Sequence, residues 1–393
     1  MTAQYADIVI LGSGIAGRNA AETARRCRPD ASIIMVSQEE SCLRPLLSKS
    51  SFRSVGDDSI LMEQDAWYRK FNIQSWQTTI LSISPGSHTV HTEKGMIRYA
   101  KCIYALGSDP FIPPFSGCNL AGVFSVRTRN DAAAMKRCLP QVRQAVIIGG
   151  GVIGIEMGEM LTRYGIGVTI LESMPWLMPR VLDRETSEEY CRRLKSCRIE
   201  TGITIKRITG NKAVSGVELA DGRLFPCELV IVSCGVCPNI AIASAAGLDV
   251  QRGILVSDRM ETSAADIYAC GDCAQYLGQC PALWKVAMVQ GQIAARNACG
   301  IAVNYRADAC PVVFYSPNAS LFAMGDLAVS ETDGYRIETK RWQADQPFLV
   351  TPRYTEGYSR LVYRNGTLVG AALIGDLSQM AALKNQITGG CSR

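Results

Sequence analysis

A glycine-rich pattern occurs twice in the 393-residue chain, as GSGIAG at residues 12–17 and as GGGVIG at residues 149–154. Each copy follows a short apolar run and precedes a stretch with the composition of a helix, which predicts a strand–turn–helix unit. A second apolar run after each helix completes a βαβ unit, in which the two strands pair in parallel. The duplication therefore predicts an α/β chain with two sheets of this kind, and it raises the question of what two such loops would bind.

The surroundings of the first loop favour a dinucleotide. Residues 5–11 (YADIVIL) have the continuous apolar character of a buried parallel strand, and residues 32–37 supply the second strand, which leads to Glu39. An acidic side chain at the end of the second strand accepts hydrogen bonds from ribose hydroxyls in such units. We therefore expect a dinucleotide on the first loop, with Glu39 on its ribose.

Each glycine of the first loop has a separate expected role. Gly12 permits the tight turn after the strand, Gly14 lets the backbone approach a pyrophosphate, and Gly17 lets the helix pack closely on the strand. The amides of the helix N-terminus, together with the helix dipole, favour the negative charge of the phosphates. Ile15 and Ala16 lie in the same turn and are expected to contact the ligand as well.

The second loop has the same context. Residues 144–148 form the expected strand before it, and residues 167–171 form the strand that ends in Glu172. A carboxylate there binds the 2′-hydroxyl of NAD and repels the 2′-phosphate of NADP, and the residues that follow, SMPWLMP, contain no arginine, so NADH is favoured over NADPH. The alternative is a non-binding relic of duplication. The expected NAD contacts are Gly149, Gly151, Val152, Ile153, Gly154, Glu172 and, after a later strand, Gly235.

Three further segments end in a glycine after an apolar run. They are residues 103–107, residues 231–235, and an extended stretch that ends in Gly271 and Asp272. Ligands in α/β sheets sit beyond the carboxyl ends of the strands, and an aspartate after a glycine can accept hydrogen bonds from a ribityl chain. For any one of these segments taken alone, an ordinary turn is the favoured interpretation.

Taken together, these segments resemble the two-dinucleotide flavoprotein reductases with a glutathione-reductase-like fold. In that family the first loop holds FAD, the second holds NAD(P)H, and the Gly-Asp turn contacts FAD. The resemblance implies an FAD domain interrupted by an NAD domain, plus a small α+β C-terminal domain: residues 1–112 and 239–312 for FAD, 113–238 for NAD, and 313–393 at the end. The FAD contacts it implies are Gly12, Gly14, Ile15, Ala16, Gly17, Glu39, Arg44, Lys49, Ile80, Ala105, Gly107, Gly271, Asp272 and Val286.

Residues 42–49 (CLRPLLSK) indicate a branch of that family. The segment is similar to one in rubredoxin reductases, in ferredoxin-reductase components of oxygenases and in the flavin part of NADH-dependent nitrite reductases. The resemblance places Arg44 and Lys49 beside the flavin, where a cation stabilises the negative charge of the reduced ring; solvated surface cations are the alternative. Two departures are Cys42 in place of a tyrosine and Tyr315 in place of a flavin-side lysine. Residues 368–376 also resemble the end of these reductases.

Glu156 is a third candidate for a catalytic role, in addition to Arg44 and Lys49. It is expected in the first turn of the helix that follows the second loop. The resemblance places it near the nicotinamide and flavin rings, whereas a glutamate in a first turn can also simply complement the helix dipole.

The chain contains 16 cysteines, which we expect to be mostly buried, reduced thiols. Cys234 with Cys237, and Cys270 with Cys273, have the spacing of a metal site, but both pairs fall in turns with an expected dinucleotide role, so no metal is predicted. Cys42 alone could serve as a redox thiol, although its surroundings differ from those of NADH oxidases and coenzyme A disulfide reductases.

The remaining features exclude other classes. The net charge of +5 comes without a basic block, so no nucleic acid is expected as a partner. No apolar run is long enough to span a membrane and no signal peptide is apparent, so a cytoplasmic location is expected. We predict an oxidoreductase that passes electrons from NADH through FAD to a small one-electron carrier such as rubredoxin. The alternatives are an NADH oxidase or disulfide reductase that uses Cys42, and a flavoprotein subunit of a larger redox complex.

Overall fold

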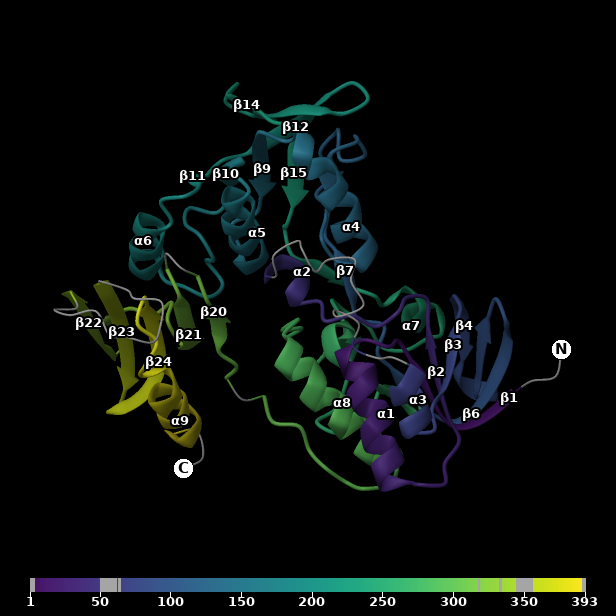
Figure 1. Ribbon diagram of the computed structural model, residues 1–393. Coiled ribbons are helices and arrows are strands. Elements are labelled where there is room, and N and C mark those ends of the chain that lie inside the picture. Colours follow the sequence, from purple (N-terminus) through teal and green to yellow (C-terminus); the bar gives the residue numbers. More distant parts are fainter. Residues whose placement is uncertain are drawn as a thin grey trace.

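The computed structural model describes residues 4–49, 62, 65–307, 309–316, 319–331, 334–343 and 356–390. Figure 1 shows three bodies, each built around its own sheet. The first contains the N-terminal strand and the helices α1 and α8, the second contains α4 and α5, and the third is formed by the C-terminal strands with α9.

The first body is a seven-stranded mixed sheet in the order β3-β2-β1-β6-β5-β4, with β18 also paired to β6. Pairing is parallel from β3 to β6 and between β6 and β18, and antiparallel for β4 and β5. The strands are β1 (Gln4–Leu11), β2 (Ile33–Ser37), β3 (Gln74–Gln77), β4 (Ile80–Ser84), β5 (Thr89–Thr92), β6 (Gly95–Tyr104) and β18 (Ile267–Ala269). The sheet thus joins strands from both ends of the chain, as an interrupted domain requires.

Two helices pack closely on this sheet, α1 (Ile15–Cys27) and α8 (Trp284–Ala298). A Cβ atom placed on Gly291 of α8 would lie 2.2 Å from the carbonyl oxygen of Ala16, so only glycine permits this approach. Ile8 and Ile10 of β1 are fully buried, which agrees with the apolar run of the sequence. Smaller elements of this part are α2 (Leu46–Lys49), α3 (Asp65–Lys70), α7 (Ala241–Ala245), β17 (Ile254–Leu255), β19 (Ala274–Gln275), η2 (Pro85–Ser87) and η4 (Gly271–Cys273).

The second body is a fully parallel sheet in the order β11-β10-β9-β15-β8. Its strands are β8 (Val123–Phe124), β9 (Gln144–Ile148), β10 (Gly167–Leu171), β11 (Arg198–Glu200) and β15 (Leu229–Val232). Its helical segments are α4 (Arg129–Cys138), η3 (Leu139–Gln141), α5 (Val152–Arg163) and α6 (Arg184–Arg193). An antiparallel sheet lies at its outer end, formed by β12 (Ile205–Gly210), β13 (Val214–Leu219) and β14 (Leu224–Pro226). The pair β7 (Ser108–Pro110) and β16 (Val236–Pro238) connects it to the first body.

The third body is an antiparallel sheet in the order β20-β21-β24-β23-β22 with one helix. The elements are β20 (Val312–Phe314), β21 (Leu321–Gly325), β22 (Tyr335–Gln343), β23 (Glu356–Arg364), β24 (Thr367–Ile374) and α9 (Met380–Gly390). One face shares a core with α5 and the other face packs on α9. Arg360 of β23 forms ion pairs with Asp183 (3.2 Å) and Glu185 (3.3 Å) at the start of α6, which joins this sheet to the second body.

The architecture confirms the predicted fold class: two α/β units with parallel sheets and a small α+β C-terminal unit. The domain boundaries themselves stay a prediction. Among the described helices, none is long and apolar enough to cross a membrane.

Candidate dinucleotide site

All three bodies contribute to one cavity with a volume of about 1610 Å³. Ligand pockets of ordinary size measure roughly 300–1,000 Å³, so this cavity has room for more than one small ligand. It runs from the first glycine loop to the second, and its wall includes η4, the start of α8 and residues 310–313, which lead into β20 of the C-terminal sheet. The loops expected to hold two dinucleotides therefore open into a single space.

The first loop has the geometry of a phosphate cradle. Gly12 has a φ of +104°, and a Cβ atom there would lie 2.3 Å from the carbonyl oxygen of Ala105. A Cβ atom on Gly17 would lie 1.9 Å from the carbonyl oxygen of Gly12, so both glycines are required by the protein's own backbone. Gly14 differs, because its Cβ atom would meet nothing within 4 Å on the side of the cavity. That open approach is the space a pyrophosphate needs, so the loop fits the group that the sequence predicts.

The second loop repeats this geometry. Gly149 has a φ of +106° and its Cβ atom would lie 2.5 Å from the carbonyl oxygen of Ser233. A Cβ atom on Gly154 would lie 2.1 Å from the carbonyl oxygen of Gly149, whereas one on Gly151 would meet nothing within 4 Å. Both α1 and α5 begin after these glycines without a side-chain cap, which leaves the amides of their first turns for an anion.

Glu172 lies at the cavity wall at the end of β10, with its side chain almost fully buried. Its Oε2 accepts a hydrogen bond from the amide of Gly150 (2.7 Å) and its Oε1 accepts one from the amide of Met174 (2.8 Å). These bonds fix the carboxylate where a ribose would lie, and its oxygens keep lone pairs for ribose hydroxyls. Arg180 lines the same cavity, eight residues beyond Glu172 and directly after the arginine-free stretch SMPWLMP.

Glu39 follows β2 and lines the other end of the cavity. Its side chain is half exposed and lies 3.9 Å from the guanidinium of Arg44, which is too long for a strong ion pair. The hydroxyls of Ser13 and Ser37 donate to its backbone carbonyl (3.3 and 3.0 Å) and hold the turn in place. Because the carboxylate is weakly engaged, it is available to ribose hydroxyls.

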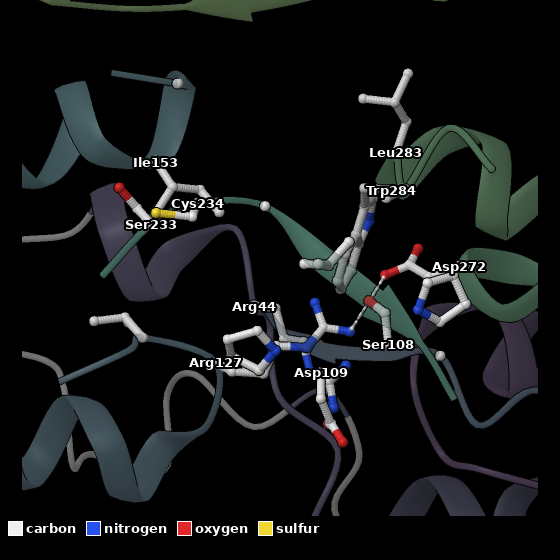
Figure 2. A pocket seen from close by; sticks show the side chains of 18 of the residues that line it. Arg44, Ser108, Asp109, Arg127, Ile153, Ser233, Cys234, Asp272, Leu283 and Trp284 are labelled. Atoms are coloured by element: carbon white, nitrogen blue, oxygen red, sulfur yellow. Dashed lines mark hydrogen bonds and ion pairs between the residues drawn. The ribbon is translucent and has the colours of Figure 1, made fainter. Parts of the chain in front are cut away.

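Asp272 is held by two partners that the sequence did not indicate. Its Oδ2 accepts hydrogen bonds from Ser108 Oγ (2.8 Å) and from Arg127 (3.2 Å), as Figure 2 shows. The amide of the preceding Gly271 donates to Gln290 of α8 (2.9 Å), which fixes the turn. A cation therefore stands beside the aspartate that was expected to contact a ribityl chain.

Arg127 is the main functional candidate that sequence reasoning missed. Burial and the neighbouring Arg44 lower the pKa of its guanidinium, and Asp272 opposes that shift. Its Nε is buried and has no hydrogen-bond partner among the described residues, so the site offers a donor that a bound phosphate or flavin oxygen could use. Nothing in its local sequence pattern distinguishes it from neighbouring arginines; only the tertiary fold brings it to Asp272.

Arg44 lines the cavity as expected, and Figure 2 shows it beside Arg127. Cys42 also lines the cavity, but burial raises the pKa of its thiol. The side chain of Lys49 lies outside the described part of the structure, so its expected place beside the flavin is untested.

Glu156 lies in the second turn of α5, because the helix begins at Val152, and the expectation of a first-turn glutamate was wrong. A role in complementing the helix dipole is therefore a poor explanation for it. Its side chain is buried, it lines the cavity, and it accepts a hydrogen bond from Ser48.

The other predicted contacts fall into two groups. Those that line the cavity are Ile15, Ala16, Ile80, Ala105, Gly107, Gly271, Val152, Ile153 and Gly235. Gly17 and Gly154 lie behind their loops, and Val286 packs into the core of the first body. Leu283, Trp284 and Ala287 of the same segment line the cavity instead, and Figure 2 shows Leu283 and Trp284 among the side chains of the pocket.

The cysteines give no metal site in the described residues. All fifteen cysteines in that part are free thiols, and five of them are buried, so the expectation of mostly buried thiols was wrong. Burial raises the pKa of Cys234 to about 11 and that of Cys273 to about 12, which opposes the thiolate form that binds metals.

A cavity that joins two glycine cradles defines the class of two-dinucleotide oxidoreductases, and comparison with known proteins agrees. Residues 6–291 match the pyridine nucleotide-disulphide oxidoreductase family, and the chain belongs to this family. The family uses FAD and NAD(P)H, so the protein is an NAD(P)H-dependent flavin oxidoreductase.

Relatives of known name extend over nearly the whole chain. The chain is 30% identical to the NADH-rubredoxin oxidoreductase of Clostridium acetobutylicum, over 97% of this chain and 94% of the relative. It is 29% identical to the NAD(P)H nitrite reductase of Bacillus subtilis, over 95% of this chain, but it spans only 46% of that larger protein. Among solved structures, the covalent putidaredoxin reductase–putidaredoxin complex matches with a TM-score of 0.83 and 26% identity, covering 99% of this chain and 94% of that one.

Proposed function

We propose that the protein is an NADH-dependent FAD oxidoreductase that delivers electrons to a small one-electron carrier protein such as rubredoxin. The observation that carries this proposal is the pair of glycine cradles that open into one cavity. A single cradle would serve one dinucleotide, whereas two cradles that share a cavity bring two dinucleotides within reach of each other.

The first cradle would hold the pyrophosphate of FAD through the amides that follow Gly14, with Glu39 on the ribose and Asp272 on the ribityl chain. Arg127 and Arg44 would supply positive charge beside the ring system. When bound, FAD would take up the hydride of NADH and release its electrons singly, a property of the cofactor rather than of the protein.

The second cradle would hold NADH, with Glu172 on the 2′-hydroxyl of its adenosine ribose. The two amides that fix the Glu172 carboxylate support this role, because an orientated carboxylate discriminates best between a hydroxyl and a phosphate. Arg180 on the same wall is the feature that would favour NADPH, so the preference for NADH is the part of the proposal most open to test.

The charge of the chain and the relatives it matches both favour a small carrier protein as the acceptor. A net charge of +5 favours an acidic partner. A relative named for rubredoxin covers nearly the full chain, and a solved relative is held in a complex with putidaredoxin. Cys42 gives little support for a disulfide reductase, because burial disfavours its thiolate.

The test is steady-state turnover of the FAD-loaded protein with NADH and, in separate assays, oxidised rubredoxin, a [2Fe–2S] ferredoxin, oxygen and a small disulfide. We expect multiple turnovers with one of the iron proteins and slow turnover with oxygen and the disulfide. Fastest turnover with oxygen or the disulfide would refute the carrier assignment.

A second candidate follows from the length of the nitrite reductase relative, of which this chain spans about half. The protein could act as the flavin part of a larger redox complex. In that case the purified chain would be reduced by NADH but would turn over with none of the four acceptors.

A further inference from the structure

Helix α5 carries two buried glutamates, Glu156 and Glu159, three residues apart. A buried carboxylate is costly unless hydrogen-bond donors engage it, so the donors that each one meets are informative. Each glutamate accepts a hydrogen bond from a serine that belongs to a different part of the chain.

One donor to Glu156 is Ser48 of α2, 108 residues earlier in the sequence. Ser48 Oγ lies 2.5 Å from Glu156 Oε2, both side chains are buried, and α2 packs against α5. Both residues line the cavity between the two glycine cradles. In Figure 1, α2 lies between the lower end of α5 and the first body.

One donor to Glu159 is Ser316, which follows β20. This pair is also buried, but neither residue lines the cavity. Helix α5 is thus bonded to α2 on one side and to the C-terminal segment on another, by two pairs of the same chemistry.

We propose that Ser48 is a positioning residue for hydride transfer: its hydrogen bond fixes the Glu156 carboxylate and the distance between the NADH cradle and the flavin side of the cavity. The proposal rests on the proposed function. Ser48 then controls the distance between the two dinucleotides and does not take part in the binding of either one.

Helix α5 begins directly after Gly151, so any shift of α5 carries the second cradle with it. Ser48 belongs to the segment that also carries Arg44, which lines the flavin side. The hydrogen bond from Ser48 to Glu156, one turn into α5, therefore links the two cradles at the place where their ligands have to meet.

Hydride transfer depends steeply on this distance. Reacting atoms need to approach to roughly 3–3.5 Å, and a misplacement of about 1 Å can cost about 10²-fold in rate. A hydroxyl that donates to a carboxylate gives a stronger and more directional bond than one between neutral groups, which suits it to hold such a distance. Loss of the bond should therefore slow the transfer while both cofactors still bind.

The experiment compares the FAD-loaded unaltered protein with Ser48→Ala, Ser48→Cys, Ser48→Thr and Ser316→Ala. Cysteine keeps the shape of serine with a somewhat larger atom and is a weak donor, and threonine keeps the hydroxyl. Ser316→Ala is the matched control, because it removes the same bond from the same helix away from the cavity. The readouts are FAD content, the Kd for NADH and the rate of flavin bleaching at saturating NADH in an anaerobic stopped-flow instrument.

We expect Ser48→Ala and Ser48→Cys to lower the bleaching rate by about tenfold or more, with the Kd for NADH changed by less than about threefold. Ser48→Thr should recover most of the rate, and Ser316→Ala should match the unaltered protein. A rate that is unchanged in the alanine and cysteine variants, or equally reduced in Ser316→Ala, would overturn the proposal.

Loss of FAD is read separately. If Ser48→Ala does not retain FAD, the bleaching rate of Ser48→Cys is the test. Loss of FAD from both variants would overturn the proposal, because it would show that Ser48 acts on flavin binding. If NADH fails to bleach the unaltered protein, the proposed function itself is wrong, and this result is distinct from any difference among the variants.

Discussion

The two glycines at the open points of the cradles allow binding to be separated from folding. At Gly14 the backbone has a φ of −63° and a ψ of −179°, which any residue adopts, and a Cβ atom there would meet nothing within 4 Å. Gly14→Ala should therefore fold normally. Replacing glycine by alanine at a permissive position changes stability by no more than about 1 kcal/mol, so the melting temperature of the apoprotein should move by at most about 4 °C.

The same substitution should abolish tight FAD binding. The added methyl group occupies the side from which the pyrophosphate has to approach the helix amides. A hydrogen bond from an amide to a charged group contributes roughly 1.5–3 kcal/mol, so the loss of one or two of them costs about 3 kcal/mol. The Kd for FAD should then rise by about 100-fold or more.

The assay is fluorescence titration of the apoprotein with FAD, together with a thermal melt of each variant. Gly151→Ala is the matched variant on the second cradle, where a Cβ atom is also unopposed. It should retain FAD at the native Kd and weaken NADH binding instead. Native FAD affinity in Gly14→Ala, or loss of FAD in Gly151→Ala, would refute the assignment of the loops.

Three further substitutions test individual side chains. Arg127→Met leaves Asp272 without its cation. Because these side chains keep 18% and 17% of their surface exposed, the free energy of unfolding of the apoprotein in urea should fall by about 2–3 kcal/mol, below the ~3–5 kcal/mol of a fully buried pair. An unchanged urea midpoint would contradict the ion pair. Cys42→Ser should keep more than about half of the carrier turnover. In the unaltered protein, burial raises the pKa of the Cys42 thiol, so its alkylation by iodoacetamide should be slow at pH 8 and accelerate at higher pH. Glu172→Gln removes the charge that opposes a 2′-phosphate and leaves Arg180 in place, so the ratio of kcat/KM for NADPH to that for NADH should rise by about tenfold or more; an unchanged ratio would show that Glu172 does not select the nucleotide.

The parts of the structure that the sequence predicted are those encoded locally. The two βαβ units could be predicted because a continuous apolar run, a glycine turn and a helix follow one another in the chain. The strand over residues 144–148 and the strand over residues 167–171 have the expected limits. The positions of Gly12 and Gly149 could be predicted as well, because a left-handed turn before a helix selects glycine.

The parts that could not be predicted depend on contacts between distant segments. Arg127 and Ser108 meet Asp272 across more than 140 residues, and no local pattern marks either of them. Ser48 and Glu156 meet in the same way. The sequence predicts Val286 at the cavity, whereas Ala287 lies there. The register of α8 against the cavity is set by its close packing on α1, which the helical periodicity alone does not fix.

The central claim is that two dinucleotides meet in one cavity and exchange a hydride. An anaerobic titration of the FAD-loaded protein with NADH, followed at the flavin absorbance band, tests it most directly. The account predicts that the band bleaches in proportion to added NADH and that bleaching is complete at about one NADH per FAD. A protein that retains no FAD after reconstitution, or whose flavin band is unchanged by excess NADH, would contradict the account.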